Sequence, residues 1–221
     1  MGHLIVHIRD EASWHKERGK GIGGSDAACV LGLSPYKSNV DLWREKTGRK
    51  QPEDISDKPA VKYGKDAEEH LRGIFILDYP QYALNYSPYD LHINEKHQFI
   101  KATLDGELTH LTTQTKGILE IKTSTILKQN DWEKWDNKIP MNYFCQVLHY
   151  FLIDEDYKFC KLKAQLKYTN PNDQEVRATT RHYHILRDNH IKDLEELKEA
   201  EIKFWHYVEN DIEPPLMLPN I

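Results

Sequence analysis

The sequence contains few cysteines and no long apolar run. Its three cysteines, Cys29, Cys145 and Cys160, are widely separated and form no C-x-x-C pair. The sequence therefore indicates no disulfide framework, no zinc ribbon and no iron–sulfur cluster with four cysteine ligands. No apolar run approaches the ~20 residues of a membrane span, and the N-terminal segment has no signal-peptide core. These absences predict a soluble protein of a reducing cytoplasm, with no membrane partner.

Familiar nucleotide and zinc motifs are missing as well. The run "GIGG" is not followed by the G-K-S/T of a phosphate-binding loop, so ATP use is not predicted. Twelve histidines raise the question of zinc, and His182 and His184 would share one face of a strand. No H-E-x-x-H or paired cysteine motif accompanies them, so the pattern indicates no zinc site.

The charge of the chain is low in total and uneven along its length. The formal net charge of the 221 residues is −5. Residues 188–213 carry nine acidic side chains and three lysines, so the rest of the chain is close to neutral. Total charge therefore neither indicates nor excludes a polyanionic partner, which would need a locally basic groove or an oligomeric channel.

A single domain of mixed α and β structure is predicted for residues 1–221, because this length with 39% hydrophobic content suits one core. We find no internal repeat and no long linker. Apolar spacing and capping residues predict helices at 24–33, 38–48, 60–77 and 140–153, and an acidic amphipathic helix at about 188–209. Alternating residues predict strands within 91–108 and 117–124, and a hairpin made of 158–168 and 176–186.

The segment "GILEIKTS" carries an acid and a base two positions apart. On a strand, Glu120 and Lys122 point to one face while Leu119 and Ile121 point to the core. A hairpin would bring Asp105, from the preceding run "ATLDGEL", close to Glu120. Two adjacent carboxylates favour a hard ion such as Mg²⁺, and a neighbouring lysine can orient an attacking water for phosphodiester hydrolysis. The alternative is an exposed cross-strand ion pair of little energetic weight.

Four motifs, in this order and spacing, resemble the lambda-exonuclease-like alkaline nucleases of phages and prophages, including the YqaJ-type viral recombinases of the PD-(D/E)xK superfamily. They are "WHKERGKGIGGSDAACVLGLSPYKSNVDLWREKTG", the G-x-x-x-E helix "YGKDAEEHLRGIF", the core "ATLDGEL…GILEIKTS" and the Q-x-x-x-Y helix "IPMNYFCQVLHYFLI". The resemblance covers most of the chain. It implies a restriction-endonuclease-like α/β fold, with a central mixed sheet flanked by helices. The implied activity is 5′-to-3′ exonuclease action on linear double-stranded DNA, with Mg²⁺, or Mn²⁺ in its place.

The resemblance also implies roles for particular residues. The implied metal ligands are Glu68, Asp105, Glu120 and the main-chain carbonyl of Ile121; the catalytic lysine is Lys122; the supporting residues are Gln146, Tyr150 and Tyr143. Without the family, Glu68 is an ordinary helix glutamate with Glu69 as its competitor. Gln146 and Tyr150 would equally suit the boundary and the core of an amphipathic helix.

Phosphate contacts are implied for two residues of the first motif. Arg18 and Ser25 match positions that contact DNA phosphate, so we expect them to hold the 5′ end of the substrate near the metal. From the residues alone, Ser25 could instead cap a helix, and Arg18 could be a solvated loop residue. Many family members have Pro or Ser just before the aspartate, whereas this chain has Thr103 and Leu104. A phosphate contact there would come from Thr103 or be absent.

The resemblance implies partners and a setting too. It implies a ring-shaped homotrimer with DNA in its channel, and a phage single-strand annealing protein that takes up the 3′ overhang for recombination. The protein would be encoded by a phage or prophage and act in the bacterial cytoplasm. Two alternatives stay open: another PD-(D/E)xK endonuclease, which would cut closed circular DNA, and a non-enzymatic DNA-binding or assembly subunit.

Overall fold

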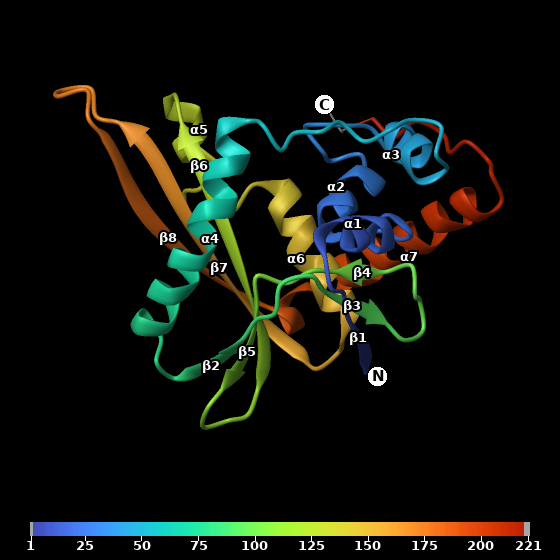
Figure 1. The fold of residues 1–221 in the computed structure, drawn as a ribbon, viewed down its shortest axis with the longest axis horizontal. Coiled ribbons are helices and arrows are strands. Elements are labelled where there is room, and N and C mark those ends of the chain that lie inside the picture. Colours follow the sequence, from blue (N-terminus) through green and yellow to red (C-terminus); the bar gives the residue numbers. More distant parts are fainter. Residues whose placement is uncertain (1, 219–221) are drawn as a thin grey trace.

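Two β-sheets carry the helices of this fold (Figure 1). The computed structural model describes residues 2–218. A five-stranded sheet has the order β2-β5-β6-β7-β8, and a three-stranded sheet has the order β1-β3-β4. The strands are β1 His3–His7, β2 Tyr82–Asn85, β3 Asp90–Asn94, β4 Lys101–Ala102, β5 Gly106–His110, β6 Lys116–Ile126, β7 Tyr157–Thr169 and β8 Val176–Leu186.

The helices are α1 Glu11–Gly19, α2 Ala27–Val30, α3 Asn39–Lys46, α4 Pro59–Asp78, α5 Gln129–Glu133, α6 Met141–Ile153 and α7 Ile191–Glu209, with 3₁₀ turns η1 Gly24–Asp26 and η2 Arg187–His190. No helix within residues 2–218 is both long enough and apolar enough to cross a membrane.

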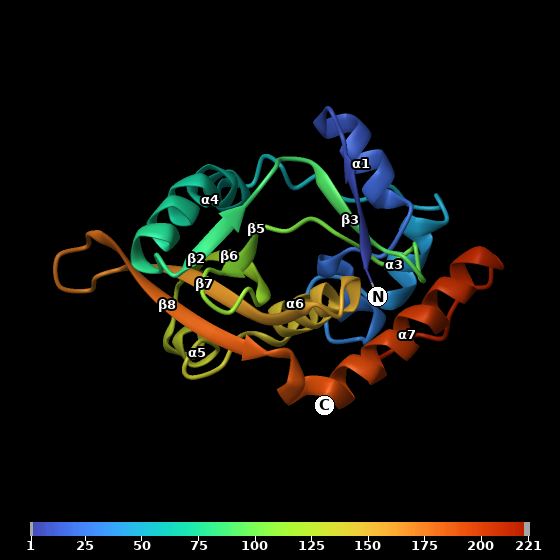
Figure 2. The same ribbon diagram turned by 90° about the horizontal axis from the view of Figure 1, so that it is seen from below.

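The larger sheet is mixed, as the family resemblance implies. Strand β6 pairs antiparallel with β5 and parallel with β7. Strands β7 and β8 form the predicted hairpin, which projects beyond the helices in Figures 1 and 2. The parallel pair requires a crossover, and α5 and α6 supply it between β6 and β7. The mixed α/β fold is confirmed, while the separate three-stranded sheet was not anticipated.

Both faces of β6 are covered by helices. On one face, Leu119 and Ile121 pack with Leu71 and Phe75 of α4. On the other face, Ile118 packs in the cluster that contains the apolar residues of α6. Because side chains alternate along a strand, Glu120 points toward the α6 side. It is only 1% exposed, so the E-x-K pair is not a solvated surface pair.

Capping residues mark the two ends of α3 where the sequence places them. Ser38 caps α3 by accepting a hydrogen bond from the Asp41 amide at 3.1 Å, and Gly48 follows the helix with a φ of 75°. The helix expected at 24–33 is shorter, because it is a 3₁₀ turn followed by one α-helical turn. The terminal helix begins at Ile191, since the residues before it form another 3₁₀ turn.

A buried ion pair joins α6 to the acidic helix α7. The Nδ1 atom of His149 lies 2.7 Å from Oε1 of Glu201, and both side chains are fully buried. His149 Nε2 donates to the carbonyl of Lys101 at 2.9 Å. Burial alone would lower the pKa of His149, but the Glu201 carboxylate outweighs it and raises that pKa. The sequence spacing gave no sign of this pair, because its members are far apart in the chain.

We expect Glu201→Ala to lower the free energy of unfolding by about 3 kcal/mol, because it leaves His149 buried without its charged partner. Glu199→Ala, an exposed acidic residue of the same helix, is the matched control and should change it by less than ~0.5 kcal/mol. Urea unfolding of both variants measures the difference. Equal losses would show that the pair has no special role in joining the helices.

Candidate active site

The β5–β6 hairpin brings Asp105 and Glu120 together. Gly106 pairs with Leu119 across the two strands, so Asp105 lies beside Glu120 at the open end of the hairpin, away from its turn. Oδ2 of Asp105 accepts a hydrogen bond from the Ile121 amide at 2.7 Å, which fixes the direction of its side chain. The proximity predicted from sequence is present in the structure.

Helix α4 adds a third carboxylate. Glu68 is half-buried, whereas its competitor Glu69 is exposed. Burial first, and then the charge of Asp105, raise the pKa of Glu68 to about 7. Glu68 of α4 therefore lies within electrostatic reach of Asp105, which precedes β5 and lies beside Glu120 of β6.

The acid and base of the E-x-K segment are in direct contact. Nζ of Lys122 lies 2.5 Å from Oε1 of Glu120. Burial raises the pKa of Glu120 to about 8, although the charge of Lys122 opposes the shift. Burial would lower the pKa of Lys122, but Glu120 and Asp105 outweigh it and raise that pKa above its usual value. Lys122 therefore keeps its proton, and it also lies 4.9 Å from the ring centroid of Tyr143.

Helix α6 forms a wall beside these groups. Nε2 of Gln146 donates to the hydroxyl of Tyr150 at 2.5 Å, one helical turn away. Burial, and then the charges of Glu120 and Asp105, raise the pKa of Tyr150 well above its usual value. Tyr150 therefore stays neutral beside the acidic cluster and is a hydrogen-bond donor there.

The side chains of Arg18 and Ser25 are in contact, and Ser25 belongs to η1, which packs against α6. Nη2 of Arg18 donates to Oγ of Ser25 at 2.9 Å. Ser25 is not a helix cap, because Gly23 is the N-cap of η1 and Asp26 is the N-cap of α2. The side chain of Asp26 accepts a hydrogen bond from the Gly23 amide at 3.1 Å. The Arg18 charge opposes the rise in the pKa of Tyr150, so the guanidinium lies within electrostatic reach of that hydroxyl.

Thr103 lies between β4 and β5 in the chain and contacts Trp14 of α1. Its hydroxyl accepts a hydrogen bond from Nε1 of Trp14 at 3.0 Å. The hydroxyl proton of Thr103 is therefore the part left for another partner. The same indole ring lies 5.2 Å from the guanidinium carbon of Arg18. Trp14 thus links the predicted phosphate residues, and the sequence motif containing it did not reveal that contact.

The residue that sequence reasoning missed is Arg72. Its Nε donates to the main-chain carbonyl of Asp105 at 2.7 Å, and its guanidinium lies 3.5 Å from the ring centroid of Tyr86. Arg72 is buried, and its Nη2 has no hydrogen-bond partner among the described residues. Arg72 follows Glu68 by four residues, so the two side chains share one face of α4. This spacing could have indicated from the sequence that Arg72 lies close to the site.

The donor set fits a hard divalent cation. Neither carboxylate oxygen of Glu120 has a hydrogen bond of good geometry among the described residues, although both are buried. Without a cation, the raised pKa values show that Glu68, Asp105 and Glu120 cannot all be ionised at neutral pH. A divalent ion removes this repulsion, and carboxylate oxygens are the ligands that Mg²⁺ prefers.

Comparison with solved structures identifies the class of fold. The alkaline exonuclease LHK-Exo from Laribacter hongkongensis matches with a TM-score of 0.64 and 18% identity, over 92% of this chain and 95% of that chain. The structure of LHK-Exo in complex with dAMP matches with a TM-score of 0.55 and 17% identity, over 90% and 95%. The chain therefore has the fold seen in an alkaline exonuclease.

Sequence comparison then gives the family. The model of the YqaJ-like viral recombinase domain matches residues 13–156, a segment that contains every predicted site residue. This chain belongs to the YqaJ-like viral recombinase family. The protein YqaJ of Bacillus subtilis (strain 168) is 32% identical over 199 residues, which are 90% of this chain and 56% of YqaJ. The chain thus spans little more than half the length of that relative.

The raised carboxyl pKa values lead to a pH-dependent stability of the metal-free protein. A carboxyl with a higher pKa in the folded state stabilises the fold at low pH, and this contribution is lost as pH rises through the folded pKa. Since the ordinary pKa of both carboxyls is 4.5 and the folded values are about 7 for Glu68 and about 8 for Glu120, we expect the melting temperature in EDTA to fall between about pH 5 and about pH 8.

The matched variants are Glu120→Gln, which should flatten this fall, and Glu69→Gln, which should keep it because Glu69 is exposed on the same helix as Glu68. Thermal unfolding in EDTA across the pH range measures all three proteins. The same slope for Glu120→Gln as for the unmodified chain would show that Glu120 titrates normally.

Proposed function

We propose that this protein is a Mg²⁺-dependent exonuclease that degrades linear double-stranded DNA from its 5′ ends and leaves 3′ single-stranded overhangs. The observation that carries the proposal is the convergence of Glu68, Asp105 and Glu120 beside Lys122. Neighbouring carboxyls with raised pKa values, next to a protonated lysine, are suited to metal-assisted phosphodiester hydrolysis.

The acidic residues have the role of metal ligands in this proposal. Glu68, Asp105 and Glu120 would bind the ion, with the main-chain carbonyl of Ile121 as a further ligand. A bound divalent ion would stabilise the negative charge that develops on the phosphate. The hydrogen bond from the Ile121 amide holds one oxygen of Asp105, so its other oxygen is the one directed at the ion. Arg72 positions this aspartate through its main-chain carbonyl.

Lys122 has the role of orienting the attacking water. Its ammonium group keeps its proton, because Glu120 and Asp105 raise its pKa, and it lies 2.5 Å from Glu120. Once Glu120 is a ligand, the ammonium protons of Lys122 are available to the water and to the scissile phosphate. Gln146 and Tyr150 support this arrangement from α6, and Tyr143 covers the lysine from the side.

The direction of degradation rests on Arg18 and Ser25. A guanidinium and a hydroxyl that already contact each other, beside the helix that carries Tyr150, can bind a terminal 5′ phosphate. Thr103 adds a hydroxyl proton at the same side. The resulting product would be a mononucleotide. The neighbouring exonuclease LHK-Exo has been solved with dAMP, a deoxynucleoside monophosphate, which is consistent with that product class.

The partners in this proposal are the ends of duplex DNA, other copies of the chain and a single-strand annealing protein. A closed trimeric ring would sum many weak basic contacts around the DNA, which suits a chain whose net charge is only −5. The exposed acidic side chains of α7 would then face away from the channel. The setting would be the cytoplasm of a bacterium that carries the phage or prophage.

The function is tested with linear duplex DNA labelled separately at its 5′ and 3′ ends. We expect immediate loss of the 5′ label with Mg²⁺, no loss in EDTA, and an intact closed circular control. Release of the 3′ label first would contradict the polarity. Nicked circles would move the protein to the endonuclease class, and intact DNA throughout would favour a binding or assembly role.

Lys122→Ala should lower the rate of hydrolysis by at least ~100-fold while leaving the fold and metal binding intact, because it removes the group that orients the water. Asp105→Ala should lower the rate of hydrolysis too and, unlike Lys122→Ala, should weaken metal binding, because Asp105 is a proposed ligand. Lys128→Ala, an exposed lysine just after β6, is the matched control and should keep full activity. Initial rates and Mn²⁺ titrations separate these effects, and undiminished activity in Lys122→Ala would remove the proposed mechanism.

Gly24 offers a test of the α6 wall. A Cβ atom there would lie 2.6 Å from Cε1 of Tyr150 and 3.0 Å from Cγ of Gln146. We therefore expect Gly24→Ala to displace Tyr150 and lower the exonuclease rate about tenfold or more. Gly19→Ala, where a Cβ would meet nothing within 4 Å, should have no effect. Equal rates for the two variants would show that Tyr150 does not position the reacting groups.

A further inference from the structure

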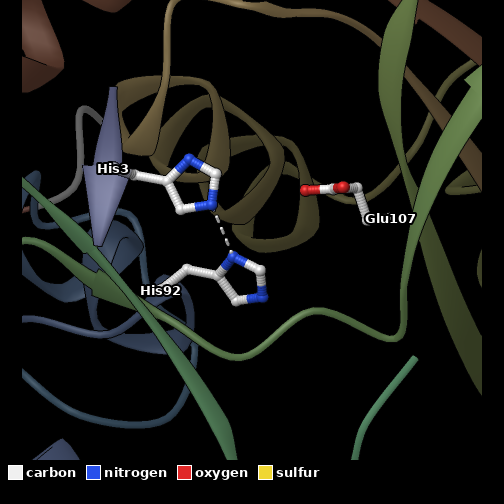
Figure 3. Close-up of side chains that lie close together, drawn as sticks. All are labelled: His3, His92 and Glu107. Atoms are coloured by element: carbon white, nitrogen blue, oxygen red, sulfur yellow. Dashed lines mark hydrogen bonds between the residues drawn. The ribbon is translucent and has the colours of Figure 1, made fainter. Parts of the chain in front are cut away.

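A second cluster of metal-ligating side chains lies outside the candidate active site. Figure 3 shows His3 of β1, His92 of β3 and Glu107 of β5 pointing toward one another. Their donor atoms all lie within 4.8 Å of each other. Nε2 of His3 is 3.0 Å from Nδ1 of His92. These residues come from both sheets, so the contact joins the two sheets directly.

An outer layer of hydrogen bonds orients these side chains. Oδ2 of Asp154 lies 2.7 Å from Nδ1 of His3, which leaves Nε2 of that ring as the electron-pair donor. The hydroxyl of Tyr157 donates to Oε2 of Glu107 at 2.6 Å. A carboxylate behind a histidine, with a further donor on the carboxylate ligand, is the arrangement that orients ligands around protein-bound metals.

We propose that His3, His92 and Glu107 bind one transition-metal ion of the zinc class. Two imidazole nitrogens and one carboxylate oxygen are a donor set that suits Zn²⁺, with water in the fourth position. Imidazole nitrogens bound to the same tetrahedral zinc lie roughly 3.3 Å apart, since each bond is about 2.05 Å long. The observed separation of 3.0 Å therefore requires only a small movement of the rings.

The protonation states fit the same assignment. Burial, with the neighbouring His3, lowers the pKa of His92 to about 4, so this ring is neutral at physiological pH. Binding requires the His92 proton to move from Nδ1 to Nε2, which releases no proton overall. Tyr157 keeps its proton, because burial and Glu107 raise its pKa, and so it stays a donor to Glu107.

The ion would stabilise the hairpin that carries Asp105. Glu107 is two residues after Asp105 along the same chain segment, and β1 and β3 belong to the smaller sheet. A metal bound there would tie β5 to that sheet. The proposal does not depend on the exonuclease function, and His3 and Tyr157 lie outside the segment matched by the family model. The sequence motifs indicated no zinc site, since these donors are distant in sequence.

The test is a Co²⁺ titration of the full chain, prepared without a polyhistidine tag and in excess Mg²⁺ so that the carboxylate site is occupied. We expect one equivalent of Co²⁺ to give the visible absorption of a tetrahedral site, and Zn²⁺ to displace it. His92→Gln and Glu107→Gln should lose the signal. Asp154→Asn should weaken binding about 10- to 100-fold.

His182→Gln is the matched control, because His182 is exposed and packs beside Tyr79, away from the cluster. It should bind Co²⁺ as the unmodified chain does. Zn²⁺ should also raise the melting temperature of the unmodified chain and of this control, but not that of Glu107→Gln. An unmodified chain that gives no tetrahedral signal, or equal binding by His92→Gln, would overturn the proposal and leave a hydrogen-bonded contact between the sheets.

Discussion

Repulsion among three neighbouring carboxylates, of which Glu120 is buried and Glu68 and Asp105 are half-buried, is the constraint on which the site depends. Glu68 lies on α4, Glu120 on β6 and Asp105 just before β5. Burial raises the pKa of all three carboxyls, and the charge of Asp105 adds to the rise at Glu68 and Glu120. A fold that served stability alone would place apolar side chains here. The surrounding elements instead keep these groups together, which is understandable if a divalent ion neutralises them.

The rest of the architecture holds this arrangement in place. The β5–β6 pairing fixes Asp105 against the Ile121 amide, and Arg72 holds its main-chain carbonyl. Gly24 has no side chain, and this allows the turn η1 to pack closely against Tyr150 of α6. The covering of both faces of β6 excludes water from Glu120, so each charge there interacts strongly with its neighbours.

Much of the fold and of the candidate site follows from local patterns in the sequence. Strand alternation and turn length bring Asp105 to Glu120. The choice of Glu68 over Glu69 comes from the family motif, and the structure shows Glu69 to be the exposed one of the two. Contacts between distant segments could not be predicted in the same way. His3 meets His92 only because β1 pairs with β3, and a single sequence does not specify that pairing. The buried pair of His149 and Glu201 likewise joins two segments that are far apart in the sequence, so it could not be predicted either.

The most direct measurement is an anomalous difference map from crystals of the protein soaked in Mn²⁺. The account predicts a peak between the carboxylate oxygens of Glu68, Asp105 and Glu120, and no peak there in crystals of Glu120→Gln. Crystals that take up Mn²⁺ elsewhere but show no density among these three side chains would contradict it, because their convergence would then need another explanation.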